Sequence, residues 1–152
     1  MLYISIITLS IILDRITKSL AVKYLMPIPT FPLWKDVFHL TYCENTGAAF
    51  SMFSNSTMAL TVFSVLIAVL LFLFLIGQIK KNPEKKFYLT GITMIIGGAI
   101  GNIIDRITLG YVVDFFDFTL INFAIFNVAD CFICVGGAIF CLYLLFDKEI
   151  QL

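Results

Sequence analysis

The stretch from Gly97 to Asp130 places several ionisable side chains beside apolar runs, in a chain with only 10 acidic and 10 basic residues. A charged residue at mid-bilayer costs about 2.5–3.5 kcal/mol, and less near the interface, so charges in such a stretch are candidates for function. The ionisable residues of the stretch are Asp105, Arg106, Asp114, Asp117 and Asp130. Asp114 and Asp130 each end or begin an apolar run, and we interpret them as a catalytic pair.

Two carboxylates that share one site cannot both ionise easily, so one of them keeps its proton. The ionised carboxylate can then take a proton from a bridging water, while the protonated one polarises a carbonyl group. The pair Asp114 and Asp130 therefore predicts peptide-bond hydrolysis without a metal, a cofactor or a covalent intermediate. The sequence has no His-x-x-x-His pair, no G-x-S-x-G elbow and no P-loop that would supply another chemistry.

Further residues are spaced along single faces of the helices that are expected to carry or adjoin this pair. Gly98, Asn102 and Arg106 follow an i, i+4, i+8 spacing on one face, and Asn127 lies three residues before Asp130. Amide, guanidinium and carboxylate groups that meet in a dry pocket must bond to one another, because unpaired burial is too costly. The alternative is that the carboxylates only pair with Arg106 and lysines to support folding.

Asp14 and Lys18 are spaced i, i+4 and so share one face of the first apolar segment. They form either a simple ion pair within the helix or a charged face turned toward the interior of the protein, and the spacing does not decide between the two. We interpret the single histidine, His39, as a surface or strand residue rather than a catalytic one. The chain has four cysteines, of which Cys131-x-x-Cys134 is interpreted as helix packing rather than as a redox or metal pair.

The composition requires a membrane. The chain is 61% hydrophobic and 13% charged, with a mean hydropathy of +1.02. Soluble domains have about a quarter of their residues charged, so a soluble domain could not hide this much apolar side chain. The zero net charge and the lack of a basic stripe give no indication of nucleic-acid binding. We expect one all-α integral membrane domain over residues 1–152.

Four segments are long and apolar enough to cross a bilayer as helices. We place them at about residues 2–22, 57–77, 87–106 and 125–146. The first is interpreted as a transmembrane helix rather than a signal peptide, because it has no basic start and no small-residue cleavage site follows it. Glycines in the third segment are spaced for close helix approach in lipid.

Two other segments are expected outside the hydrocarbon core. Residues 24–56 contain three prolines that rule out a continuous helix, followed by a β-prone run, and they predict a small β-cradle on the bilayer surface. Trp34 and Tyr42 in it suit the aromatic belt of the interface. Residues 107–124 are expected to form a short, irregular interfacial segment. Both segments are assigned to the extracytoplasmic face, because four lysines crowd the loop 78–86 and predict that it lies in the cytoplasm with both termini.

Five short motifs in order resemble the lipoprotein signal peptidase (signal peptidase II) family of bacterial intramembrane aspartic peptidases. The motifs are Asp14-x-x-Thr17-Lys18, Asn45-Thr46-Gly47-Ala48-Ala49-Phe50, Gly98-x-x-x-Asn102-x-x-Asp105-Arg106, Val112-Val113-Asp114 and Phe126-Asn127-Val128-Ala129-Asp130. The resemblance covers essentially the whole chain. It places the chain in the bacterial cytoplasmic membrane with its active site toward the extracytoplasmic face, where we expect the chain to act as a monomer. It also implies cleavage of prolipoproteins just before a diacylglyceryl-modified cysteine.

The resemblance assigns the catalytic dyad to Asp114 and Asp130. It implies that the surrounding residues contact substrate or support the dyad, with Asp105 supporting Arg106. These residues are Asp14, Lys18, Asn45, Gly47, Asn102, Asp105, Arg106 and Asn127. Two alternatives compete with this function: a small transporter or channel subunit that uses Asp14, Lys18 and Arg106 as an ion path, and an assembly subunit without activity. The clustering of polar residues at one face and the lack of a repeat favour the peptidase.

Overall fold

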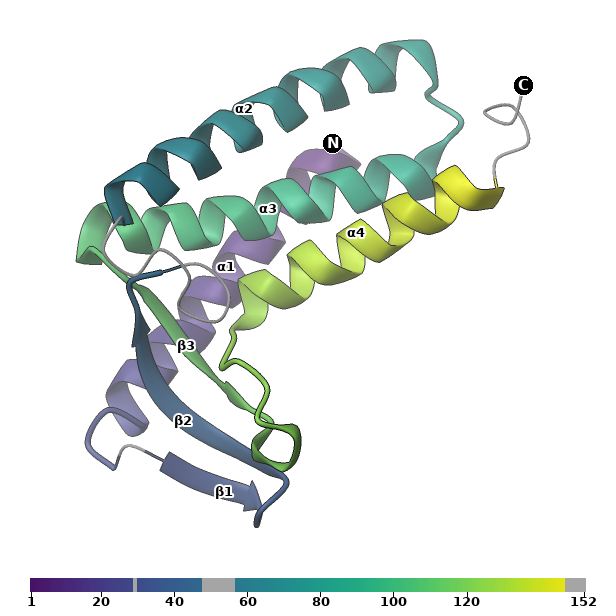
Figure 1. The fold of residues 1–152 in the computed structure, drawn as a ribbon. Coiled ribbons are helices and arrows are strands. Elements are labelled where there is room, and N and C mark those ends of the chain that lie inside the picture. Colours follow the sequence, from purple (N-terminus) through teal and green to yellow (C-terminus); the bar gives the residue numbers. More distant parts are fainter. Residues whose placement is uncertain (29, 48–56, 147–152) are drawn as a thin grey trace.

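The computed structural model describes residues 1–28, 30–47 and 57–146. Helices gather at one side of the molecule and a small sheet projects from one end of them (Figure 1). Two features of the sequence analysis lie outside the described residues: the last part of the predicted 24–56 unit and the Ala48-Ala49-Phe50 portion of its motif.

Each of the four predicted spans coincides with a helix. The helices are α1 (Leu2–Tyr24), α2 (Thr57–Lys81), α3 (Lys86–Leu109) and α4 (Val128–Phe146). By length and composition, α2, α3 and α4 qualify as membrane-crossing helices among the described residues. Helix α1 carries Asp14, Arg15 and Lys18, which lower its hydropathy, but Asp14 and Lys18 are buried and its exposed face is largely apolar. The outward face of α1 therefore suits lipid as well.

Helix α3 is the centre of the helical layer, since it packs against α1, α2 and α4. In the most apolar stretch of α3, 61% of the residues are buried inside the protein. The corresponding fractions are 17% for α2 and 11% for α4, so these two helices are largely open to lipid. Close packing of α3 on α4 depends on glycine. A Cβ atom at Gly136 would lie 2.5 Å from the backbone oxygen of Gly91, and one at Gly98 would collide with the backbone oxygen of Ala129. Small residues at such crossings allow two helix backbones to approach closely in lipid.

Three antiparallel strands form the sheet in the order β1-β2-β3, namely β1 (Thr30–Trp34), β2 (Phe38–Asn45) and β3 (Val112–Asp117). The prediction that residues 107–124 are irregular is wrong for β3. Its sequence, VVDFFD, is rich in the β-branched and aromatic residues that favour strands, and it pairs along β2 with Cys43 opposite Asp114. A short 3₁₀ turn, η2 (Thr119–Ile121), follows.

The turn between α3 and β3 is short and depends on Gly110. This residue has a φ of 83°, in the left-handed region that glycine adopts without strain, and its N–H bonds to the carbonyl of Arg106 at 3.2 Å. The chain therefore reverses at once, so that β3 begins directly beside the end of α3. This reversal carries Asp114 back toward the helices.

Adjacent glycines on α4 give a matched test of the helix contact. We expect Gly136→Ala to lower the free energy of unfolding by about 1–3 kcal/mol, because the added methyl must displace the α3 backbone. A Cβ atom at Gly137 would meet no described heavy atom within 4 Å beyond its own helix, so Gly137→Ala should not lower stability and should raise it by up to about 1 kcal/mol through helix propensity. Thermal unfolding of the two variants in the same detergent measures the difference. Equal unfolding temperatures would contradict this account of the α3–α4 contact.

Candidate active site

Asp114 and Asp130 line one cavity of about 490 Å³ at the junction of the helices and the sheet. Asp114 lies in β3 and is 2% exposed, whereas Asp130 lies in the first turn of α4 and is partly buried. Asn127 joins them. Its side-chain Nδ2 donates to Asp114 Oδ1 at 2.6 Å, and its backbone N–H donates to Asp130 Oδ2 at 3.1 Å.

A second amide, that of Asn102 on α3, holds the other oxygen of Asp130. Asn102 Nδ2 donates to Asp130 Oδ1 at 2.8 Å. Its Oδ1 accepts hydrogen bonds from Lys18 Nζ at 2.9 Å and from Asn127 Nδ2 at 3.1 Å. With its oxygen occupied by two donors, the amide can turn only its nitrogen toward Asp130. The orientation of Asn102 is thus fixed by its neighbours.

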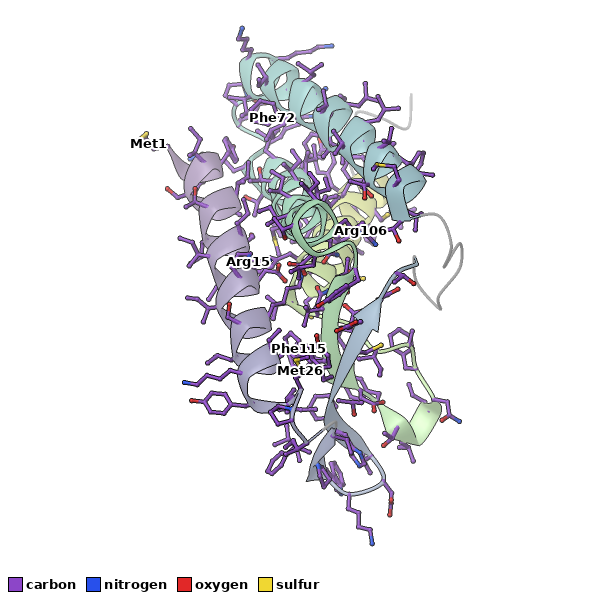
Figure 2. The ribbon with its side chains drawn as sticks, turned by 90° about the vertical axis from the view of Figure 1, so that its left-hand side faces the viewer. Met1, Arg15, Met26, Phe72, Arg106 and Phe115 are labelled. Carbon is purple, nitrogen blue, oxygen red and sulfur yellow. The ribbon has the colours of Figure 1, made fainter. Side chains whose placement is uncertain are left out.

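The end of β2 and the residues after it reach the site through Asn45 and Gly47. Asn45 Nδ2 donates to Asp114 Oδ2 at 2.9 Å, and its Oδ1 accepts the N–H of Gly47 at 2.9 Å. The carbonyl of Gly47 in turn accepts a bond from Arg106 Nη2 at 3.0 Å. Arg106 lines the cavity from α3 (Figure 2). The structure therefore brings Asn45 into contact with Asp114 and links Asn45 to Arg106 through Gly47.

Behind the dyad, four charged residues form a cluster between α1 and α3, and three of them, Asp14, Lys18 and Asp105, are buried. Lys18 Nζ lies 2.9 Å from Asp14 Oδ2 and 2.9 Å from Asp105 Oδ2, and Asp105 Oδ1 pairs with Arg15. The i, i+4 pair of Asp14 and Lys18 thus faces the interior. The carboxylate of Asp105 bonds to Arg15 and Lys18, whereas Arg106 bonds to the carbonyl of Gly47, so the support of Arg106 by Asp105 stays a prediction. Sequence reasoning missed Arg15, whose partner is 90 residues away and leaves no local signal.

The rest of the cavity wall is apolar apart from two thiols. Cys131 and Cys134 both line it, and Cys134 is exposed, so their interpretation as helix-packing residues alone missed this position. His39 lies in β2 and does not line this cavity. The apolar wall consists of Val112, Phe123, Ala124, Ile125, Phe126, Ile133 and Val135.

Comparison with known proteins identifies the family. A family model described as signal peptidase (SPase) II matches residues 6–146. The chain belongs to the signal peptidase II family. The lipoprotein signal peptidase of Caldanaerobacter subterraneus is 49% identical over 148 residues, which are 97% of this chain and 99% of that protein. That of Clostridioides difficile is 42% identical over 149 residues, 98% of each chain.

The fold agrees with this assignment. A solved structure of a bacterial membrane enzyme, 28% identical in sequence, superposes with a TM-score of 0.81 over 99% of this chain and 91% of the other. A second bacterial membrane enzyme, also 28% identical, gives a TM-score of 0.78 over 96% and 94%. The chain is therefore a multi-pass membrane protein of bacterial type. Membership of the signal peptidase II family favours the peptidase over the transporter and the inactive assembly subunit.

Electrostatics in the cavity act strongly on Asp114, the carboxylate that lies in the sheet. Burial raises the pKa of Asp114 from an ordinary 3.8 to about 6; the hydrogen bond from Asn45 opposes the rise, and the charge of Asp130 adds to it. A carboxyl group with a raised pKa in the folded chain binds its proton more tightly there than in the unfolded chain. Its contribution to stability is complete below pH 3.8 and is lost as the pH rises through about 6.

This shift predicts how stability depends on pH. Between about pH 5 and pH 7 the ionisation of Asp114 should cost the folded protein about 1 kcal/mol. Asp114→Asn cannot ionise, so its unfolding temperature should fall less over that range than that of the unsubstituted chain. The measurement is thermal unfolding of both proteins in one detergent at each pH. Parallel curves would show that Asp114 does not titrate in this range.

Proposed function

We propose that Asp114 and Asp130 are the catalytic carboxylates, and that the chain cleaves prolipoproteins just before a lipid-modified cysteine. As a member of the signal peptidase II family, the chain is a lipoprotein signal peptidase, an aspartic peptidase that processes prolipoproteins. One observation carries the choice of residues: two carboxylates from separate elements are held by one asparagine, Asn127, at the wall of a single cavity.

The two carboxylates share one proton, since two like charges in one poorly solvated site cannot both ionise easily. The ionised member takes a proton from a water molecule, whose oxygen attacks the carbonyl carbon of the substrate. The protonated member donates to the carbonyl oxygen as the tetrahedral intermediate forms. The carboxyl group that took the proton of water passes it to the departing amide nitrogen. As the C–N bond breaks, a hydroxyl of the intermediate becomes the carbonyl of the new acid and returns its proton to the other carboxylate, so that the dyad again holds one proton.

The surrounding residues keep this pair in place. Asn45, Asn102 and Asn127 occupy carboxylate oxygens through amide donors, which leaves each aspartate with little freedom to rotate. Arg106 adds a positive charge at the same cavity, which favours the ionised member of the pair. Fixed donors of this kind need no rearrangement during the reaction.

The apolar wall of the cavity supports a lipid-bearing substrate. Side chains of α4 and of the segment before it, among them Phe123, Ile133 and Val135, face the space that Asp114 and Asp130 line. Because the exposed surface of α4 is apolar and suited to lipid, a diacylglyceryl group can approach within the bilayer while its peptide reaches the dyad. The substrate class we propose is accordingly a prolipoprotein with a diacylglyceryl cysteine, bound by a single copy of the chain.

Replacing the carboxyl group of either Asp114 or Asp130 by an amide should stop the reaction. Asp114→Asn and Asp130→Asn keep side-chain size but cannot exchange a proton with water, and such proton transfer contributes about 10²–10⁴-fold to rates. Each substitution should abolish turnover, and the double substitution should be scarcely worse, because the two residues act as a unit. The measurement is gel-shift cleavage of a diacylglyceryl prolipoprotein, with an unlipidated copy expected to remain uncut.

Asp117→Asn is the matched control for this experiment. Asp117 ends the same strand, but it bonds to Thr41 at 2.7 Å and does not line the cavity, so most activity should remain. EDTA should also leave activity unchanged. Substantial turnover by Asp114→Asn, loss of turnover in Asp117→Asn, or inhibition by EDTA that zinc reverses would each overturn the proposed dyad.

The orientation of the site in the membrane gives a separate prediction. The loop between α2 and α3 is flanked by Lys80, Lys81, Lys85 and Lys86, and positive charge of this kind stays in the cytoplasm. We expect a cysteine at Asn82 to react with an impermeant maleimide only from the cytoplasmic side, and one at Lys35, in the β1–β2 turn, only from outside. A background without the native cysteines prevents other labelling. The reverse pattern would place the dyad at the cytoplasmic face.

A further inference from the structure

Lys18 lies at the centre of the ion cluster and contacts side chains of both the cluster and the site. Lys18 is 2% exposed, and its Nζ lies 2.9 Å from each of three oxygens, on Asp14, Asp105 and Asn102. The ammonium group donates a hydrogen bond to Asn102 Oδ1 and forms ion pairs with the carboxylates of Asp14 and Asp105. Lys18 thereby connects the two carboxylates of the cluster to the amide that holds Asp130.

Each carboxylate of the cluster also holds the backbone immediately before one dyad residue. Asp14 Oδ1 accepts the N–H of Ala129 at 3.0 Å, and Ala129 precedes Asp130. Asp105 Oδ2 accepts the N–H of Val113 at 3.2 Å, and Val113 precedes Asp114. The amides of Ala129 and Val113 belong to residues that are 0% and 1% exposed. The cluster therefore fixes the main chain at both dyad positions.

Charge balance in this cluster depends on Arg15. Asp14 and Asp105 bring two negative charges and Lys18 one positive charge, and all three side chains are buried. Arg15 supplies the second positive charge, bonding through Nη1 to the oxygen of Asp105 that faces away from Lys18. Its side chain is 38% exposed and extends from the side of α1 that faces α3, so it borders the cluster at the protein surface (Figure 2). An unbalanced charge buried this deeply would rearrange the groups around it.

We propose that Arg15 is a positioning residue for the dyad, acting through Asp105 and Lys18; this inference rests on the proposed function of Asp114 and Asp130. Without Arg15, the second oxygen of Asp105 loses its partner and Lys18 is drawn toward the unbalanced carboxylate. The contact of Lys18 with Asn102, and that of Asn102 with Asp130, then lengthens. A misplacement of about 1 Å at reacting groups costs roughly 10²-fold in rate. Arg15 does not line the cavity, so the loss should fall on kcat and not on KM.

Arg15→Gln, Arg15→Lys and Lys23→Gln test this role with a lipidated prolipoprotein. We expect Arg15→Gln to lower kcat at least about tenfold with KM within about twofold, whereas Arg15→Lys, which keeps the charge, should stay within about threefold of the unsubstituted enzyme. Lys23 is the control, since it lies on the same helix and contacts the ring of Tyr24 rather than the cluster. Lys23→Gln should leave both constants unchanged. Full kcat in Arg15→Gln, or equal loss in Arg15→Lys, would overturn the proposal.

Charge balance is tested separately by the double substitution Arg15→Gln/Asp105→Asn, in which Asp14 and Lys18 again balance. Its kcat should exceed that of Arg15→Gln alone, so that the two effects are not additive. If Arg15→Gln cannot be purified, recovery of the double variant as folded protein supports the proposal. Additive losses, or failure of both variants to fold, would overturn it. Asp130→Asn in the same assay tells the proposals apart: an active Asp130→Asn would refute the dyad, whereas an inactive one beside an unaffected Arg15→Gln refutes only the role of Arg15.

Discussion

The burial of charged side chains between the helices is the constraint on which the rest of the structure depends. Water cannot satisfy Lys18, Asp14 or Asp105, so the protein must supply every partner itself. It does so with groups from different elements: α1 gives the lysine, α3 gives Asp105, and the α4 backbone gives the N–H of Ala129. The same contacts that make these charges tolerable also define where the helices meet.

Small residues make those contacts possible. A Cβ atom at Gly101 would lie 2.6 Å from Asp14 Oδ2, and one at Gly97 would lie 2.7 Å from the Cβ of Ser10. The glycines of α3 therefore create the space into which α1 places a carboxylate, in addition to allowing the close approach of α4. Helix packing and the placement of charge therefore depend on the same residues, because a larger side chain at Gly101 would also displace the Asp14 carboxylate.

Periodicity and hydropathy predicted the helices well, since their apolar faces are long and uninterrupted. The strand β3 was missed because VVDFFD lies beside an apolar helix, where β-prone and interfacial sequences look alike. Asp105 was expected to support the adjacent Arg106, but its turn toward α1 was not predicted, because successive helix residues point in different directions. The motifs placed Asp114 and Asp130 in one site, but only the three-dimensional contacts show that Asn127 joins them.

The left-handed turn at Gly110 has a mechanical consequence. Only two residues separate α3 from β3, and Asp105 bonds to Val113 across that turn, so helix and strand form a single rigid body that carries Asp114. The far end of the strand is tied by reciprocal bonds between Phe116 and Phe126. A wider cavity for a bulky substrate cannot come from hinging at Asp114. Phe123, Ala124 and Ile125 line the cavity between these fixed points, and we expect this part of the wall to move for a bulky substrate while Asp114 stays in place.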